Sequence, residues 1–323
     1  MGGWKTVIKI AVSLGLLVAL VLFSGVETTL KALQRLPVGT MLGCMGVYLL
    51  SQAISAYRWQ QLSKTQGFQA SYGQYVRWYL MGMFFSLCLP GSMGGDGAKV
   101  LWLAHACQRK KREAFLTVLA ERGSGLLAML WITTVACWGY NATASSAVFH
   151  LPVGLVGGLG SVGVLGLIGL VLWLRVDAVY HWLVAISRRV KALHFLEEAL
   201  LVWRSPQFWI NSIGLSLVVQ GLMVAIHLWL IAGFGWTISG LYLAATYGVV
   251  NLLSILPIAF AGFGVREGGY QWFFAQAGFT AADGLAFALA FAGVFTVVSL
   301  LGGAVWLLDS SNERSPEALQ ESD

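Results

Sequence analysis

The chain has 323 residues, of which 58% are hydrophobic and only 11% are charged. Soluble domains carry roughly 25% charged residues, so this composition excludes an ordinary soluble enzyme and predicts an all-α polytopic membrane protein. The formal net charge is +6. Its cations cluster between apolar runs, where they indicate membrane orientation rather than binding to nucleic acid.

Six apolar runs approach or exceed the roughly 20 residues that a spanning helix needs. They comprise residues 7–25, 38–56, 114–138, 151–174, 208–232 and 284–308. The first resembles a signal sequence but lacks an A-x-A cleavage signal, so we expect it to be retained. Lys5 and Lys9 precede or enter this run and place the N-terminus in the cytoplasm. We therefore expect an integral protein of the cytoplasmic (inner) membrane.

Two further apolar segments are interrupted by related motifs. Residues 89–99 and 256–266 both fit the pattern Leu-Pro-x4-Gly-x-Gly-x-[Lys/Arg]. Proline and glycine leave backbone groups unpaired, which a membrane protein tolerates only where they face protein or a wet cavity. Paired interruptions of this kind indicate the central site of a transporter built from repeats. We predict an inverted repeat, with copies at about 38–138 and 208–308.

The first interrupted segment, 75–106, is predicted to be a re-entrant helical hairpin. Cations at Arg77 and Arg109 place both of its ends on the cytoplasmic side. Its two arms rise about 14–18 Å each, roughly half the hydrocarbon thickness. The second segment, 241–282, is expected to re-enter from the other side. Residues 241–258 are also long enough to span fully, which leaves the side of the C-terminus open.

The remaining segments fit one membrane domain, 1–308, followed by a disordered acidic tail, 309–323. Residues 177–203 have apolar side chains at helical spacing with charges between them, which predicts an interfacial helix or, as the alternative, a surface for a partner. Cys44, Cys88 and Cys137 lie in apolar runs and are expected to pack there. The four cysteines have no metal-binding spacing, and we expect neither a metal nor another cofactor.

Charged residues within the apolar segments are costly and need partners or a polar cavity. Asp96 and Lys99 are three residues apart and share a helix face, so they are expected to pair. Adjacent residues on a helix point apart. We therefore expect Arg266 and Glu267 to pair with other groups. His227 is expected to be a hydrogen-bonded packing residue.

An anion such as a phosphate is the ligand that these cations and nearby helix N-termini would hold. The predicted substrate-binding residues are Lys99, Arg266, Gly95, Gly97, Gly262, Gly264, Arg58 and Arg122. Arg58 follows Tyr57 at the end of a span, and it is alternatively an interfacial anchor. Three carboxylates, those of Asp96, Glu121 and Glu267, are candidates either for carrying a coupling proton or ion, or for structural ion pairs.

Four motifs together resemble the flippase-like family named for the transmembrane region of lysylphosphatidylglycerol synthase. In chain order they are Tyr57-Arg58-Trp59, Pro90-Gly91-Ser92-Met93-Gly94-Gly95-Asp96, Glu121-Arg122 and Gly262-Phe263-Gly264-Val265-Arg266-Glu267-Gly268. The resemblance implies a bacterial or archaeal membrane domain that handles lipids. In the two-domain synthases of the family, this part moves the aminoacylated lipid and a soluble domain makes it. We expect no aminoacyl-transferase activity here.

These observations predict a lipid transporter of flippase or scramblase type for an anionic phospholipid or a polyprenyl-phosphate-type lipid. The headgroup would be held between the two re-entrant hairpins. Two alternatives remain: a membrane transferase acting on lipid-linked substrates through carboxylates 96, 121 and 267, and an accessory scaffold for a lipid- or glycan-modifying enzyme. Nucleic acid is not an expected partner.

Overall fold

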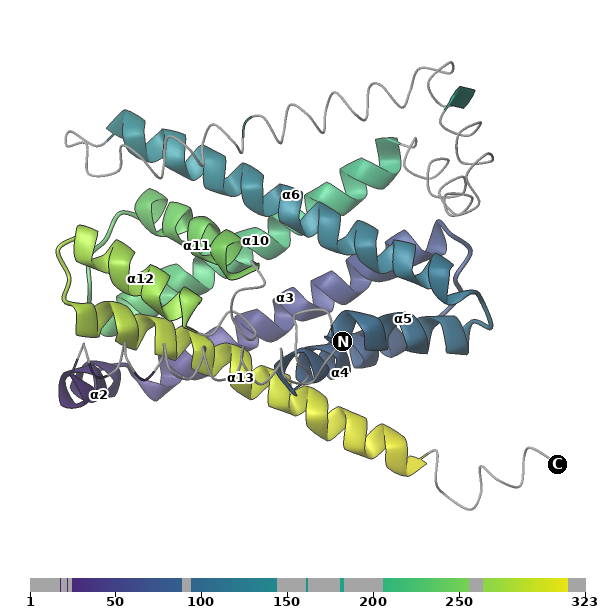
Figure 1. Cartoon of the computed structure of the whole chain (residues 1–323), viewed down its shortest axis with the longest axis horizontal. Coiled ribbons are helices and arrows are strands. Elements are labelled where there is room, and N and C mark those ends of the chain that lie inside the picture. Colours follow the sequence, from purple (N-terminus) through teal and green to yellow (C-terminus); the bar gives the residue numbers. More distant parts are fainter. Residues whose placement is uncertain are drawn as a thin grey trace.

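The computed structural model describes residues 25–88, 94–143, 206–255 and 264–312, together with a few isolated positions elsewhere. Within these ranges the chain folds into nine helices (Figure 1), which confirms the predicted all-α class. The predicted spans 7–25 and 151–174 and the amphipathic segment 177–203 lie outside the described residues.

Four long helices have the length and apolar character needed to cross a membrane. They are α3 (Val38–Lys64), α6 (Lys111–Thr143), α10 (Pro206–Phe234) and α13 (Ala281–Asn312). Each contains one of the predicted spans. The shortest, α3, has 27 residues, which at 1.5 Å per residue reach about 40 Å. α13 continues to Asn312, so the first residues of the predicted tail 309–323 are helical, and the rest of that tail lies outside the described residues.

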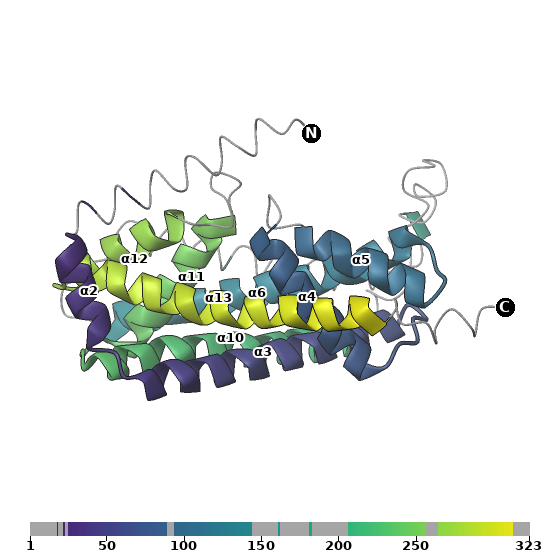
Figure 2. The ribbon, with the colours of Figure 1, turned by 90° about the horizontal axis from the view of Figure 1, so that it is seen from below.

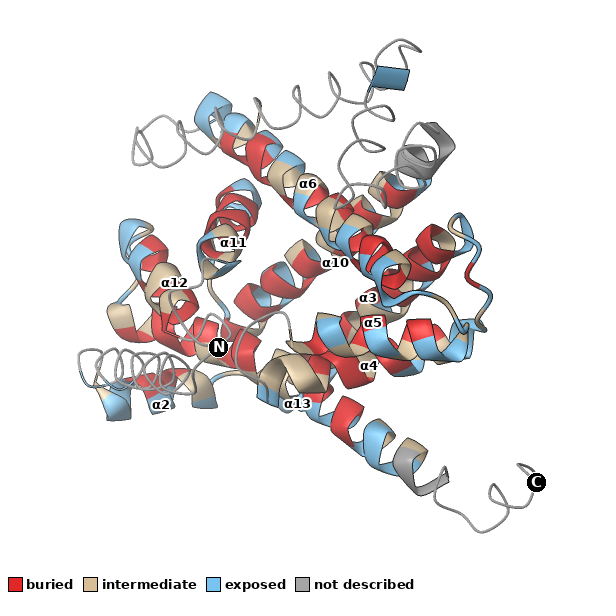
Figure 3. Ribbon diagram, turned by 45° about the vertical axis from the view of Figure 1, so that its right-hand side comes forward, coloured by how far each residue is buried: buried red, intermediate tan, exposed pale blue. Residues whose placement is uncertain are grey.

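The outer surfaces of the long helices are apolar, as a lipid environment requires. Exposed residues follow the outward faces of α6 and α13 in Figure 3, while buried ones face the neighbouring helices. Large apolar side chains such as Leu50, Trp138 and Leu300 are about half exposed or more. Soluble monomers rarely expose large contiguous apolar surfaces, so this face suits contact with acyl chains.

Two pairs of shorter helices lie at the interrupted segments. The first is α4 (Tyr72–Cys88) with α5 (Gly94–Ala106), and the second is α11 (Gly240–Ile255) with α12 (Val265–Gln276). In each pair the first helix ends just before the motif, and the second begins within it; the residues between them lie outside the described residues. The longest of the four, α4, has 17 residues and rises about 25 Å, less than the ~30 Å hydrocarbon core. The pairs occupy opposite halves of the molecule's length in Figure 1.

The two halves of the chain pack against each other through contacts between a helix of one half and a helix of the other. α3 and α10 lie side by side and run in opposite directions (Figure 2). α4 packs on α13 and α11 packs on α6, so each short pair rests on the long helix of the other half. Within each half, α5 packs on α6 and α12 on α13. A short helix, α2 (Val26–Gln34), also lies against α13.

Glycines permit the closest of these approaches. A Cβ on Gly95 of α5 would overlap the carbonyl oxygen of Gly82 on α4. Another on Gly302 of α13 would overlap the carbonyl oxygen of Leu80, also on α4. Small residues let membrane helices approach at backbone distance. α4 is therefore clamped between α5 on one side and α13 on the other.

Local signals set several helix ends. α4 begins at a reciprocal cap in which the amide of Ser71 donates to Gln74 Oε1 at 2.8 Å and the amide of Gln74 donates to Ser71 Oγ at 3.3 Å. α10 ends at Phe234 and is followed by Gly235, whose φ of 71° lies in the left-handed region. The next amide, that of Trp236, donates back to the carbonyl of Ile231 at 3.1 Å, as glycine-terminated helices commonly do.

The cysteine prediction is correct at two positions and wrong at the third. Cys44 and Cys137 are buried and pack in the core, whereas Cys88 is exposed. Cys88 is the last residue of α4.

Replacing Gly302 by alanine should destabilise the fold although alanine favours helix. The added methyl group meets the backbone of α4, and overpacking of this kind costs about 1–3 kcal/mol. The matched control is Gly221→Ala on α10, where a Cβ meets nothing within 4 Å. That control should hold or raise stability by up to ~1 kcal/mol. Unfolding in detergent micelles measures both. Equal stability of the two variants would contradict the close contact.

Candidate functional site

Five charged side chains from three helices form a continuous chain of alternating sign. Arg58 of α3 pairs with Glu121 of α6 through its Nη2 atom. Lys99 Nζ of α5 lies 3.5 Å from Glu121 Oε2 and 3.1 Å from Asp96 Oδ1. Asp96 in turn accepts two bonds from Arg122 of α6, at 2.8 Å from Nε and 2.9 Å from Nη2. We call these residues the charge chain.

Helical geometry explains how α5 and α6 present these groups. Asp96 and Lys99 are three residues apart, so they share a face of α5, and their predicted pairing is confirmed. Glu121 and Arg122 are adjacent on α6 and point to different partners. They lie about 15 Å along the helix from Lys111. The charge chain is therefore well inside the span rather than at its end.

One end of the charge chain is buried and the other is open. Arg58, Lys99 and Glu121 are 4%, 2% and 1% exposed, respectively. The side chain of Asp96 is 18% exposed and that of Arg122 is 55% exposed. A buried unpaired charge costs several kcal/mol, and alternation removes that cost by giving each buried group an opposite neighbour.

Polar and aromatic side chains complete the buried end. Tyr79 Oη donates to Glu121 Oε1 at 3.1 Å. The ammonium of Lys99 lies 4.4 Å from the centroid of the Tyr79 ring and 5.4 Å from that of Trp59, within the range of cation–π attraction. Arg58 Nη1 donates to Ser216 Oγ of α10 at 2.6 Å. The interpretation of Arg58 as an interfacial anchor is wrong, because its guanidinium is buried between helices.

The charge chain has an excess positive charge. Three cations and two carboxylates, 3 − 2, leave a net charge of +1 when all five groups are ionised. The buried Nε of Arg58 also has no hydrogen-bond partner among the residues that the structure describes. A site with this balance can accept one further anion.

Arg266 and Glu267 form a second, local cluster at the start of α12. Arg266 Nε and Nη2 lie 3.0 and 2.8 Å from Glu267 Oε1. The other carboxylate oxygen accepts the amide of Gly264 at 2.6 Å. We expected these adjacent residues to pair with other groups rather than with each other, and their direct contact shows that this expectation is wrong. Glu267 folds back to cap the helix, and in this first turn the long Arg266 side chain can reach the same carboxylate.

The two clusters approach each other across α3. Tyr48, buried near the middle of that helix, lies within electrostatic range of both Arg122 and Arg266. The arginines come from different halves of the chain, and both are close enough to this one tyrosine to interact with it electrostatically. Lys99 and Arg266, which the sequence motifs place in corresponding positions, thus belong to separate but neighbouring clusters.

The motif glycines are placed differently from one another. Gly95 is buried against α4, which gives it a packing role. Gly97 is exposed, with open space where a side chain would be. Gly264 precedes α12 with a φ of 86°, a conformation that favours glycine. Gly262 lies outside the described residues. No set of three or more potential metal ligands gathers within the described part of the chain.

Other polar residues of the core were not predicted from sequence. Gln220 of α10 receives the hydroxyl of Tyr247 at 2.6 Å and donates to the carbonyl of Gly125, on α6, at 3.0 Å. His227, predicted as a packing residue, is confirmed as buried and bonded to the Met223 carbonyl at 2.7 Å and to Tyr270 Oη at 2.6 Å. Isolated polar residues in apolar runs were the available signal, but they do not identify partners.

Comparison with known proteins identifies the chain as a member of the family described as Lysylphosphatidylglycerol synthase TM region, which matches residues 6–303. A UPF0104 membrane protein from Pyrococcus horikoshii is 27% identical over 120 residues, and the match covers 36% of each chain. The chain therefore spans about a third of that curated relative. No solved structure matches significantly.

The Arg58–Glu121 pair should show strong coupling in a double-mutant cycle. Either Arg58→Ala or Glu121→Ala leaves a buried charge without its partner and should cost about 3–5 kcal/mol. The double variant should cost much less than the sum. The exposed pair of Glu27 and Lys31 is the control and should couple by about 0.3–0.5 kcal/mol. Additive losses at Arg58 and Glu121, measured by unfolding in micelles, would contradict the pairing.

Proposed function

We propose that this member of the family moves a lipid with an anionic phosphate headgroup across the bacterial inner membrane, as a flippase or scramblase. The single observation that supports it most is the open end of the charge chain. There, Arg122 is 55% exposed well inside a span, within a set of ionised groups whose net charge is +1. An exposed cation at this depth needs a polar cavity or an anionic ligand.

The helix pairs α4–α5 and α11–α12 are proposed to re-enter the membrane from opposite sides. Both α4 and α11 are shorter than a bilayer crossing, and the pairs lie in opposite halves of the molecule (Figure 1). With the N-terminus in the cytoplasm, the first pair opens to the cytoplasmic side. The two breaks then come near the membrane midplane, where backbone groups without helical partners are useful for binding.

An inverted repeat is the simplest account of the packing. If α3–α6 correspond to α10–α13, the contact of α4 with α13 becomes that of α11 with α6. The antiparallel contact of α3 with α10 maps onto itself. Alternating access in repeat-built transporters rocks one such unit against the other around a fixed site. The region between Arg122 and Arg266 is our choice for that site.

Asp96 is proposed to hold the site for the headgroup. Its carboxylate occupies the bidentate face of Arg122, which is also the face that a phosphate prefers. When a phosphate takes that position, Asp96 retains its contact with Lys99 at 3.1 Å. The exchange replaces one anion by another and leaves no buried cation unpaired.

Movement is proposed to be passive or driven by an ion gradient. Asp96 is the carboxylate best placed to couple a proton, because it is the more exposed of the two in the charge chain. Glu121 and Glu267 are almost fully buried and are assigned to structural pairing. Replacing Asp96 by a residue that cannot accept a proton would then alter the pH dependence of transport. Replacing Glu121 in the same way would not alter it in a protein that still folds.

Replacing Arg122 by glutamine should slow movement of an anionic lipid by roughly tenfold or more, since a charge-assisted bidentate contact is lost. Arg122→Lys should keep part of the rate. The assay follows fluorescent phosphatidylglycerol in proteoliposomes, with Lys31→Gln as control because Lys31 is an exposed cation on α2.

Three outcomes separate the readings. A wild-type rate in folded Arg122→Gln would overturn the site. No lipid movement by the wild type, with a new lipid product that requires the carboxylates, would replace transport by the transferase reading. No movement and no product, with a bound lipid-modifying enzyme, would favour the scaffold.

A further inference from the structure

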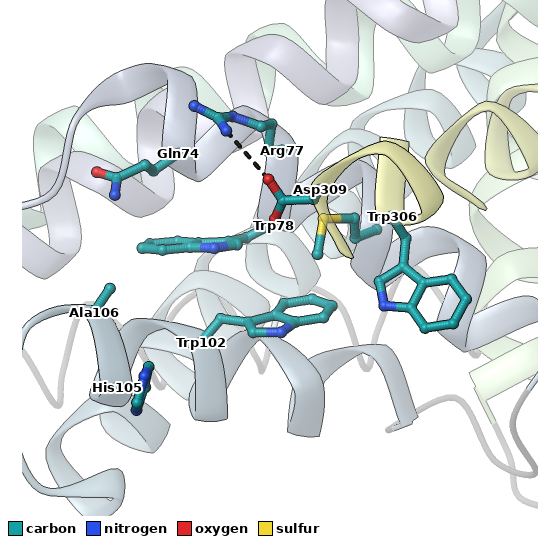
Figure 4. Close-up of a pocket in the computed structure, with 9 residues that line it drawn as sticks. Gln74, Arg77, Trp78, Trp102, His105, Ala106, Trp306 and Asp309 are labelled. Atoms are coloured by element: carbon teal, nitrogen blue, oxygen red, sulfur yellow. Dashed lines mark hydrogen bonds and ion pairs between the residues drawn. The ribbon is translucent and has the colours of Figure 1, made fainter. Parts of the chain in front are cut away.

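A pocket that shares no residue with the charge chain lies where the start of α4 meets the ends of α5 and α13. Its volume is about 280 Å³, close to the lower end of the ~300–1,000 Å³ of typical ligand sites. Three helices line it, and Figure 4 shows the side chains converging. Those that carry the argument are Arg77 and Trp78 of α4, Trp102 and His105 of α5, and Trp306 and Asp309 of α13.

The pocket has fixed aromatic walls. Trp78 is 7% exposed and packs edge-on against Tyr75, with ring centroids 5.5 Å apart. Trp102 and Trp306 both pack against Phe85, at 5.7 and 5.6 Å. Each indole thus comes from a different helix and is supported from behind. Aromatic faces held in this way attract alkylammonium and ammonium groups.

Opposite charges line the same pocket but hold each other weakly. Arg77 Nη1 lies 3.3 Å from Asp309 Oδ1, and the side chains are 55% and 35% exposed. Exposed pairs of this kind contribute little stability, so a ligand can separate them at small cost. The lining carries one full positive and one full negative charge, and it also includes the imidazole of His105. Its charge balance is therefore zero when His105 is neutral, unlike the +1 of the charge chain.

The position of the pocket suits the membrane–water interface. Arg77 lies in the second turn of α4, His105 in the last turn of α5 and Asp309 near the end of α13. The cationic loop that begins at Arg109 follows α5 directly. Tryptophan and arginine are typical of this zone, where one end of a side chain is apolar and the other wet.

We propose that this pocket binds the zwitterionic headgroup of a membrane phospholipid that carries a phosphate and an amine, as in phosphatidylethanolamine. The phosphate pairs with Arg77, and the ammonium lies against the indoles and Asp309. A neutral zwitterion satisfies both charges at once, whereas an anionic headgroup would leave Asp309 opposed by a like charge. The bound lipid bridges α4, α5 and α13 and stabilises the α4–α5 pair by mass action.

Native mass spectrometry of the whole protein, titrated with phosphatidylethanolamine or phosphatidylglycerol, tests the site. Wild type should prefer phosphatidylethanolamine. Asp309→Asn should weaken binding of phosphatidylethanolamine by roughly fivefold to thirtyfold, because the amine loses its anionic partner. Its affinity should then equal that for phosphatidylglycerol. Trp306→Leu should weaken it similarly, while Trp272→Leu, at an exposed indole on α12, should not.

Soluble phosphoethanolamine distinguishes a lipid site from one for the free headgroup. If the soluble compound displaces the lipid at comparable concentrations, the ligand of the pocket is a small zwitterion and not a lipid. Equal binding of both lipids by the wild type, or an unchanged preference in Asp309→Asn and Trp306→Leu, would overturn the proposal. Because Arg122 lies outside this pocket, Arg122→Gln should keep the lipid preference whatever its effect on transport.

Discussion

The arrangement of the first half of the chain depends on the contacts of one buried carboxylate, that of Glu121. It belongs to α6 and receives the guanidinium of Arg58 from α3, the hydroxyl of Tyr79 from α4 and the ammonium of Lys99 from α5. One buried anion thus joins four helices. Because a buried charge without partners is costly, any rearrangement that separates these helices within the membrane must supply substitutes. This constraint keeps α3, α4, α5 and α6 in register while the outer faces remain free to contact lipid.

The second half is organised differently. Arg266 and Glu267 pair with each other in the first turn of α12, and Glu267 also caps that helix, so this ion pair does not join helices. α12 instead relies on contacts with α13 and α11, including Gly284, where a Cβ would lie 2.7 Å from the Cα of Gln271. Two related sequence motifs therefore serve different physical ends. The first binds helices electrostatically and the second prepares a helix N-terminus with a buried arginine beside it.

Sequence reasoning was sufficient where the information was local. Three features follow from hydropathy, proline and glycine placement, and helical spacing: the four spans within the described residues, the separate helices that begin at Gly94 and Val265, and the Asp96–Lys99 pair. It failed where partners lie far apart in the chain: Arg58 and Glu121 are 63 positions apart, and no pattern links them. It also failed for Arg266 and Glu267, because the rule that neighbours on a helix point apart holds in a helix interior, as at Glu121 and Arg122, but not in a first turn. Long side chains in a first turn can fold back to one point.

Charge balance distinguishes the two sites of the molecule more clearly than their residue types do. Both contain arginine and aspartate within contact distance, yet the buried chain carries +1 and the end pocket carries zero. In a low-dielectric interior, an unbalanced charge strongly favours binding of a counterion. The end pocket has no unbalanced charge. Its weak ion pair and aromatic walls instead suit a ligand that carries both a positive and a negative charge. The same membrane can therefore supply each site with a different lipid. Under the two proposals, an anionic headgroup at the charge chain and a zwitterionic one in the end pocket would not compete, because each site favours a headgroup of different net charge.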